Sequence, residues 1–400
     1  MKRRTFLKTS AVSLASALLP LGVSKAATEA VASKNQTRNG VDTPVFLTGM
    51  VKGSSGKGFK TAVREAAEAA TDFSWLSKGD AVFIKPALNS GNPYPATTSP
   101  EAIAAMTSLL IEKGAGRVIV GDMSGIEHVK LTPEGVRGSS RELMKSCGMA
   151  EAVLKAGAEL HFPEEAGWKA FYEDMPVSGP NWKTPLMMPD LLKEVDHIVL
   201  MPRCARHVLA GSTLGLKAAV GYWRTDSRLE YHRDAATFQE KTAEGNTVET
   251  LLKKQRLVIT AADKILTSFG PDKGYVVQPE TGLVIASESV VAHDMVSLAW
   301  LLLNRENIPE SEKDMFSDPY ESQFIVTMGN HWVVGKLGGW LAALTPEGLT
   351  RNDISTIWDD RILNRAYQVL GGRPRVKIKT ANRSVPGELK DRLVKKWGRS

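Results

Sequence analysis

The chain has 400 residues, of which 42% are hydrophobic, and this is enough to build a core in one large domain or two smaller ones. Its formal net charge is +7, but five positive charges and no negative one lie in residues 1–27, so the remainder carries only +2. This near balance argues against a basic nucleic-acid-binding surface, and the two cysteines are too few for a self-contained iron–sulfur cluster, which needs about four thiolates.

The amino terminus is typical of a twin-arginine export signal. Arg3 and Arg4 precede Phe-Leu-Lys, and a run of small apolar residues over 11–23 leads to Lys25 and a small-residue cleavage site. A membrane anchor or a Sec signal is the alternative, but the run is short for a bilayer span and Lys25 suits the twin-arginine route better. We expect a signal peptide over 1–27, export by the twin-arginine translocase, and a periplasmic or other extracytoplasmic location, without a stable membrane span.

Residues 28–43 are small and polar and predict a flexible leader. Beyond them, short apolar segments alternate with amphipathic ones. The predicted strands cover 45–51, 81–86, 117–122, 159–162, 197–202, 257–263 and 282–287, and the predicted helices cover 59–71, 100–113, 141–156, 191–195 and 290–303. This alternation predicts an α/β fold with a mostly parallel sheet and helices on both of its faces.

Two segments depart from that rhythm. Residues 163–189 are rich in Pro, Trp and Gly and predict an irregular connection that passes over the edge of the sheet. The tail, 306–400, contains helical pieces and one late strand over 375–379. We therefore expect a family-type α/β core over 44–305 and a smaller, mixed, largely helical C-terminal region over 306–400 that packs on the core.

Three blocks of sequence carry a resemblance to a known family. The first joins Val82–Pro86, Thr97–Pro100 and Gly114–Asp122, the second joins Met201–His207 to Thr213–Gly221, and the third joins Phe269–Gly274 to Ile285–Asp294. In this order and spacing they resemble the domain of unknown function 362 family, over about residues 45–305. The family includes proteins exported by the twin-arginine route. The resemblance implies an α/β fold but no particular activity, and this chain lacks the cysteines of the relatives that carry iron–sulfur modules.

The chain also departs from the family pattern at four polar positions. Ala87 and Ala218 stand where the family usually has Asn, Ala205 where it has Lys, and Ser289 where it has Asp. In each case the residue in this chain has a small side chain. Either this subgroup binds something different, or part of the family's site is lost.

Charged side chains near the ends of the predicted strands are the candidate binding residues. In open parallel sheets, ligands lie beyond the carboxyl ends of the strands. Lys85, Arg206 and Lys217 would suit an anionic substrate such as a carboxylate or a phosphate. The alternative is that Lys85 and Lys217 form structural ion pairs with Asp122 and Asp263.

Histidines supply the candidate chemistry. His207 is the candidate general acid–base, because an imidazole titrates near neutral pH. Asp263 is a second catalytic candidate that would orient it. His207, His232 and Asp294 are the candidate ligands of a divalent metal, although isolated histidines are more often structural.

Two functions remain open at this stage. The first is an exported α/β enzyme that binds a small anionic substrate, with assistance from a histidine acid–base or a metal. The second is a non-catalytic accessory protein of the periplasm that binds a ligand or cofactor. The His–Asp set favours the first, and the four small replacements favour the second. The sequence names neither a substrate nor a cofactor.

Overall fold

The computed structural model describes residues 40–53, 56–207, 209–234, 236–268, 270–309, 335, 337 and 354–397. The predicted signal peptide and most of the predicted leader therefore lie outside the described residues. In the described ranges, no helix combines the length and the apolar character that a membrane crossing requires.

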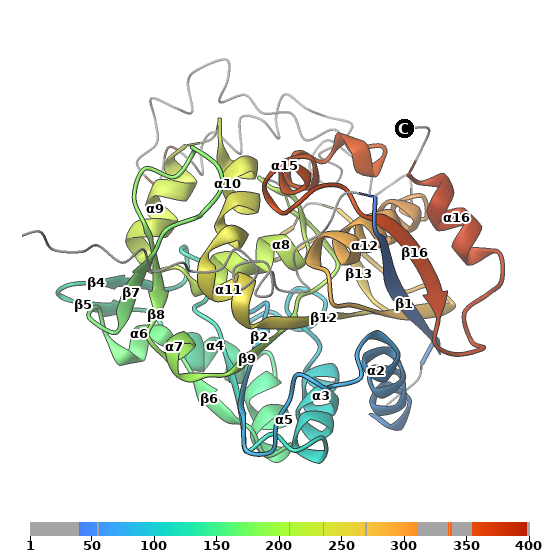
Figure 1. Ribbon diagram of the computed structural model, residues 1–400, viewed down its shortest axis with the longest axis horizontal. Coiled ribbons are helices and arrows are strands. Elements are labelled where there is room, and N and C mark those ends of the chain that lie inside the picture. The colour runs from blue at the N-terminus through green and yellow to red at the C-terminus, as the bar shows by residue number, and fades with distance from the viewer. Residues whose placement is uncertain are drawn as a thin grey trace, which may run out of the picture. The chain divides into compact units, whose positions relative to one another are not determined.

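An eight-stranded sheet forms the centre of the fold (Figure 1). Its strands, in spatial order, are β16 (Arg375–Thr380), β1 (Asp42–Val51), β15 (Thr281–Ser287), β12 (Gln255–Ala262), β9 (His197–Met201), β2 (Ala81–Pro86), β3 (Arg117–Gly121) and β6 (Glu159–His161). Of these eight, β15 runs antiparallel to both neighbours, and the other pairs are parallel. The predicted α/β fold with a mostly parallel sheet is confirmed.

Helices cover both faces of this sheet, as predicted. In the view of Figure 1, α2 (Gly56–Ala70), α3 (Pro100–Glu112) and α5 (Met149–Lys155) lie below it, and α8 (Gly215–Ala218), α10 (Phe238–Glu244), α12 (Val290–Arg305) and α15 (Arg361–Val369) lie above it. Strand β2 shows why both faces need cover: Val82 and Ile84 join the lower core, while Phe83 joins the upper one. A strand buried on both faces reads as a continuous apolar run.

The remaining elements are short, and all but the C-terminal helix lie in connections between the strands of the central sheet. They are β4 (Lys130–Thr132), β5 (Gly135–Arg137), α4 (Ser140–Ser146), α6 (Pro163–Ala166), β7 (Phe171–Asp174), β8 (Leu186–Pro189), α7 (Leu191–Glu194), β10 (Ala205–His207), β11 (Gly211–Thr213), the 3₁₀ turn η1 (Ala219–Tyr222), α9 (Thr225–Arg233), η2 (Gly245–Thr247), α11 (Glu249–Lys254), β13 (Ile265–Leu266), β14 (Val276–Val277), η5 (Ile357–Asp359) and α16 (Leu389–Lys395). The segment 163–189 contains α6 and the β7–β8 hairpin-like pair.

The described part of the C-terminal region packs on the core and extends its sheet. Strand β16 pairs in parallel with β1, with Val45 opposite Ile378. Leu363 of α15 and Leu393 of α16 belong to the same buried cluster as the residues of α12. The late strand is therefore an edge strand of the central sheet.

The order of the strands reverses between β2 and β9. From β2 the chain passes to β3 and then β6 toward one edge, and from β9 it passes to β12 on the other side. Because crossovers between parallel strands are right-handed, the two directions place their connections on opposite faces. The connection containing α3 lies below, and that containing α8 and α10 lies above (Figure 1). Such a switch point leaves a crevice at the carboxyl ends of the strands.

One predicted helix, 141–156, is divided in two. Helix α4 ends before Cys147, and α5 begins after Gly148, whose φ of 77° lies in the left-handed region. A side chain at this position would meet no atom within 4 Å, so backbone conformation alone selects glycine here.

Gly148→Ala should therefore destabilise the protein by about 1–2 kcal/mol, the cost of a left-handed residue with a Cβ. Gly148→Asn should cost less, because asparagine tolerates this region. Urea unfolding of both variants measures the difference. Equal stability of Gly148→Ala and the unaltered protein would contradict the assignment of backbone strain.

Candidate ligand-binding site

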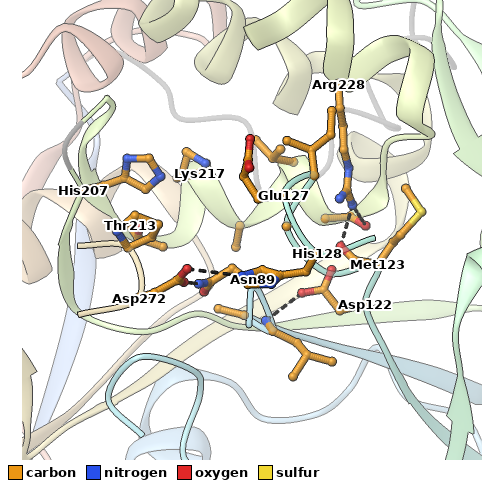
Figure 2. Close-up of a pocket in the computed structure, with 18 of the residues that line it drawn as sticks. Asn89, Asp122, Met123, Glu127, His128, His207, Thr213, Lys217, Arg228 and Asp272 are labelled. Atoms are coloured by element: carbon orange, nitrogen blue, oxygen red, sulfur yellow. Dashed lines mark hydrogen bonds and ion pairs between the residues drawn. The ribbon is translucent and has the colours of Figure 1, made fainter. Parts of the chain in front are cut away.

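A cavity of about 240 Å³ lies at the switch point, beyond the carboxyl ends of β2, β3 and β9 (Figure 2). Lys85 lies near the end of β2, Asp122 directly follows β3, and Arg203 follows β9. Lys217 comes from α8 and Arg228 from α9, which lie above the sheet. The cavity is therefore lined by side chains from both sides of the reversal.

A buried ion pair forms one part of the lining. The Lys85 ammonium lies 2.8 Å from Asp122 Oδ1 and donates to the Pro86 carbonyl at 2.7 Å, and its side chain is 1% exposed. Asp122 Oδ2 accepts the Leu88 N–H at 2.8 Å. Burial lowers the pKa of Lys85, opposed by the charge of Asp122. A Cβ at Gly221 would collide with both charged groups, so the turn above the pair can hold only glycine.

Two arginines are held by main-chain carbonyls. The Arg228 guanidinium donates to Met123 O at 2.6 Å, to Gly221 O at 2.9 Å and to Ser124 O. Arg203 donates to Pro271 O at 2.7 Å and to the carbonyl of Ala96.

These neutral acceptors leave some of the arginine N–H groups unused. Within the described part of the chain, Nε and one terminal nitrogen of Arg203, and Nε of Arg228, have no acceptor. Burial lowers the pKa of each guanidinium to about 10, so both remain cations at neutral pH. They keep donor capacity for a further oxygen.

Lys217 differs from these groups because no described residue supplies its ammonium with a hydrogen-bond acceptor or a carboxylate. Its Nζ instead lies 5.8 Å from the centre of the Tyr231 ring and 5.9 Å from that of Phe238. Burial, followed by the charges of Arg203 and Arg228, lowers the pKa of Lys217 to about 7. The structural ion pair considered from the sequence exists for Lys85 and does not form for Lys217.

His207 lies on the same wall of the cavity as Lys217 (Figure 2). Its Nδ1 accepts the backbone N–H groups of Leu209 at 3.1 Å and Ala210 at 3.2 Å. Nδ1 is therefore unprotonated, and the neutral ring carries its hydrogen on Nε2. Burial and then the charge of Lys217 hold the pKa of His207 well below its usual range. A role that needs this imidazole to titrate near neutral pH does not fit this environment.

His232 has the opposite tautomer. Its Nδ1 lies 2.7 Å from the Arg228 carbonyl, which can only accept, so Nδ1 carries the hydrogen and Nε2 keeps a lone pair. Burial and then the charge of Lys217 lower the pKa of His232 to about 3. His207 and His232 thus present neutral imidazoles to the cavity, one a donor and the other an acceptor at Nε2.

Asp294 lies behind the cavity and holds the turn that carries Lys217. Its two carboxylate oxygens accept the N–H groups of Gly215 at 2.8 Å and Leu216 at 2.7 Å. His293 lies 2.8 Å from the same carboxylate through Nδ1. These bonds use the carboxylate to fix the start of α8, so Asp294 is a positioning residue.

Two further predicted site residues also lie away from the cavity lining. The Arg206 guanidinium donates to the carbonyls of His207 and Gly211 and so braces the β10–β11 pair. Asp263 accepts the Tyr94 hydroxyl at 2.6 Å and lies in a separate small hollow beside β1. The structure places Lys85, His207, Lys217 and His232 in the lining of one cavity, and Arg206, Asp263 and Asp294 outside that lining. Asp294 shares a separate small hollow with Lys217.

The predicted metal ligands are not assembled. Across the described ranges, no three histidine, cysteine or acidic side chains are grouped as a metal site would need. Asp294 is bonded to the backbone of α8, and His232 uses Nδ1 on a carbonyl. His207, His232 and Asp294 therefore do not come together as the ligands of one metal ion.

Two arginines of the cavity lining were outside the predicted site. Arg203 follows β9, so the rule that ligands lie beyond the carboxyl ends of the strands, which selected Lys85, could also have selected Arg203. Arg228 lies on the short polar helix α9, where a buried arginine has no distinguishing pattern. Ala87 and Ala218, two of the positions that depart from the family pattern, also line the cavity.

The model of the family described as "Domain of unknown function (DUF362)" matches residues 82–299 of this chain. The match includes β2, β3, β9, β12, β15 and most of α12. None of the curated proteins matches the chain.

Two solved structures show weak similarity. A crystal structure of a protein from Thermotoga maritima matches with a TM-score of 0.38 and 12% identity, over 63% of this chain and 59% of that one. The lactate racemase apoprotein from Thermoanaerobacterium thermosaccharolyticum matches with a TM-score of 0.38 and 12% identity, over 90% of this chain and 87% of that one. The first alignment spans less than two thirds of its partner, and at this TM-score neither similarity bears on function.

The Lys85–Asp122 pair yields a stability prediction. Lys85→Met should destabilise the protein by about 3–5 kcal/mol, because it leaves a buried carboxylate without its cation. The double variant Lys85→Met/Asp122→Asn should recover part of this loss, since the amide oxygen can still accept the Leu88 N–H. Chemical unfolding of the single and double variants gives the coupling energy. A double variant no more stable than Lys85→Met would count against the pair as described.

Proposed function

The chain belongs to the domain of unknown function 362 family, and we propose that it binds a small anionic ligand in the cavity at the β2–β9 switch point. The observation that carries this proposal is Lys217, a cavity lysine to which no described residue supplies a counter-ion. Arg203 adds N–H groups without acceptors in the described chain. A carboxylate or phosphate would supply what both groups lack.

The energetics favour a ligand with a negative charge. Burial of a charge is costly unless the charge is paired and hydrogen-bonded. Lys85 meets this condition with Asp122, whereas Lys217 meets it only in part, by a lowered pKa. An anion between Lys217 and the arginines would form charge-assisted hydrogen bonds, which are shorter and stronger than neutral ones.

For His207 we propose hydrogen-bond donation to the ligand in place of proton transfer. Its neutral Nε2–H can polarise a ligand oxygen, as neutral imidazoles do in other enzymes. His232 offers its Nε2 lone pair to a ligand hydroxyl or ammonium. Together with Lys85, Lys217 and Arg203 they form the proposed site, and Asp294 positions α8 behind it.

A non-catalytic ligand-binding role is the second candidate. The observation that favours it is that His207 and His232, which line the cavity, have pKa values below their usual range and are neutral. An enzyme of the acid–base type would need a group that exchanges protons near neutral pH, and Lys217 is the cavity group whose pKa of about 7 allows this. Loss of turnover without loss of ligand affinity in Lys217→Arg, which keeps the positive charge, would favour the enzyme.

Calorimetric titration with sulfate tests the anion site. Lys217→Met should weaken sulfate binding by roughly tenfold or more, the worth of one charge-assisted hydrogen bond. Lys60→Met is the matched control, because Lys60 is an exposed lysine on α2, below the sheet. Equal weakening by both variants, or no sulfate binding by the unaltered protein, would contradict the proposed site.

The same titration has a predicted dependence on pH. Lys217 is protonated below its pKa of about 7 and neutral above it, so sulfate affinity should fall as the pH rises through about 7. Lys217→Arg keeps its charge throughout this range and should lose the dependence. Sulfate itself does not change its ionisation here, so a slope that persists in Lys217→Arg would assign it to another group.

We also propose that residues 1–27 direct export by the twin-arginine translocase and that the protein acts outside the cytoplasm. The Arg3-Arg4 pair and the apolar run that follows support this. In cells that possess this translocase, Arg3→Lys/Arg4→Lys should leave the uncleaved chain inside the cytoplasm. Arg38→Lys in the leader is the control and should be exported normally. Fractionation and mass measurement decide, and unaffected export of the double variant would contradict the route.

A further inference from the structure

Lys217, which is half-buried, is placed differently from the two buried lysines of the described chain. Lys85 pairs with Asp122 at 2.8 Å, and Lys241 pairs with Asp234 at 3.1 Å. Lys217 has neither a carboxylate nor a carbonyl acceptor among the described residues, although it lines a cavity large enough for a small molecule. A structural lysine is expected to have such a partner, so this one is better explained as a group that acts on a ligand.

The surroundings of Lys217 favour its neutral form. Aromatic rings of Tyr231 and Phe238 border the amine, and the guanidinium groups of Arg203 and Arg228 share the cavity. Cations and limited solvation both oppose protonation, and the pKa of about 7 follows from these two causes. A neutral lysine amine is a nucleophile toward carbonyl carbon, and desolvation beside other cations is a known way to produce one.

Neighbouring groups would complete a site for a carbonyl compound. His207 and Thr213 lie with Lys217 on one wall of the cavity (Figure 2). Thr213 is 6% exposed, and its hydroxyl has no hydrogen-bond partner within the described chain. The His207 Nε2–H and this hydroxyl can both donate to a carbonyl oxygen. Arg203, with its unused N–H groups, can hold a carboxylate on the same molecule.

We propose that Lys217 forms a reversible imine with the carbonyl group of a small 2-oxo acid or related carboxylated aldehyde. The inference rests on the proposed anion site, which holds the carboxylate of the ligand. It adds a covalent step to that site and narrows the ligand to molecules that carry both a carboxylate and a reactive carbonyl.

The step balances without an oxidant or a reductant. The lone pair of the Lys217 amine attacks the carbonyl carbon, a C–N bond forms, and the π electrons move to oxygen. Protons from nitrogen neutralise this oxygen, which leaves as water when the C–O bond breaks and C=N forms. His207 and Thr213 stabilise the developing oxyanion by hydrogen bonds. Water reverses the reaction.

Reductive trapping tests the proposal. The protein is incubated with glyoxylate and cyanoborohydride, which reduces imines to stable amines, and the modified lysine is located by peptide mass mapping. We expect one carboxymethyl group on Lys217, formed on the order of tenfold or more faster than on Lys60 or Lys241. The labelling rate should rise with pH through about 7, as the amine loses its proton.

Matched probes separate the requirement for a carboxylate from the requirement for a reactive carbonyl. Acetaldehyde, which has a carbonyl and no carboxylate, should label Lys217 more slowly than glyoxylate. Glycolate, which has a carboxylate and no carbonyl, should protect Lys217 from glyoxylate without labelling it. Lys217→Arg keeps the positive charge but has no nucleophilic amine at neutral pH, and it should bind glycolate and resist labelling.

The outcomes distinguish this inference from the proposed function. Sulfate or glycolate binding by calorimetry, together with the absence of selective labelling at Lys217, would overturn the imine and leave the anion site intact. Absence of anion binding as well would overturn both. Labelling spread evenly over exposed lysines would also overturn the imine, and this result needs no variant to fold.

Discussion

Burial of positive charge at one edge of the central sheet is the constraint on which the site depends. Lys85 is paired with a carboxylate, and Arg203 and Arg228 are held by main-chain carbonyls. These bonds fix the loops that follow β2 and β3 and the turn at Gly221, because each loop supplies carbonyl or carboxylate oxygens to a buried cation. The cations organise the cavity wall, and at Lys217 the described structure leaves the charge without an acceptor.

A chain of hydrogen bonds connects the sheet to Lys217. The Thr260 hydroxyl of β12 lies 2.9 Å from His293 Nε2, and Nδ1 of the same ring lies 2.8 Å from Asp294. Asp294 in turn accepts two backbone N–H groups at the start of α8, one of them from Gly215. A Cβ at Gly215 would crowd this carboxylate. Thr260 of β12 and His293 and Asp294 of α12 thus fix the position of Lys217, although none of the three lines the cavity.

The sequence predicted the layers well because apolar runs report burial directly. The strands that contain Lys85 and His197, and the helix over 290–303, could be predicted without any tertiary information. The direction of β15 was less accessible, since a strand buried on both faces reads the same in either orientation. The break at Gly148 was missed because a glycine within a helical pattern is tolerated in many helices.

The site was predicted in part, and the misplacements have a common cause. The strand-end rule succeeds for Lys85, next to the switch point, and fails for Asp263, which follows β12 farther along the sheet and is bonded to Tyr94. Charge and residue type also suggested roles for Arg206 and Asp294, but both side chains are used on nearby backbone groups. Sequence identifies residues able to bind a ligand and does not show which ones the fold has already satisfied.

The positive and negative charges that line the cavity differ in how far they are buried. Glu127 and the His128–Asp272 pair belong to the lining but are exposed or half-buried, so water screens their fields. Lys85 and Arg203 are almost fully buried, where the same charge acts more strongly because the surroundings are less polarisable. Asp122, which is also buried, offsets the charge of Lys85, but Arg203 and Arg228 are bonded to neutral carbonyls, so the inner field stays positive. An anion beside Lys217 would meet this field in a half-buried part of the cavity, and a neutral molecule of the same shape would leave the lysine without a counter-ion.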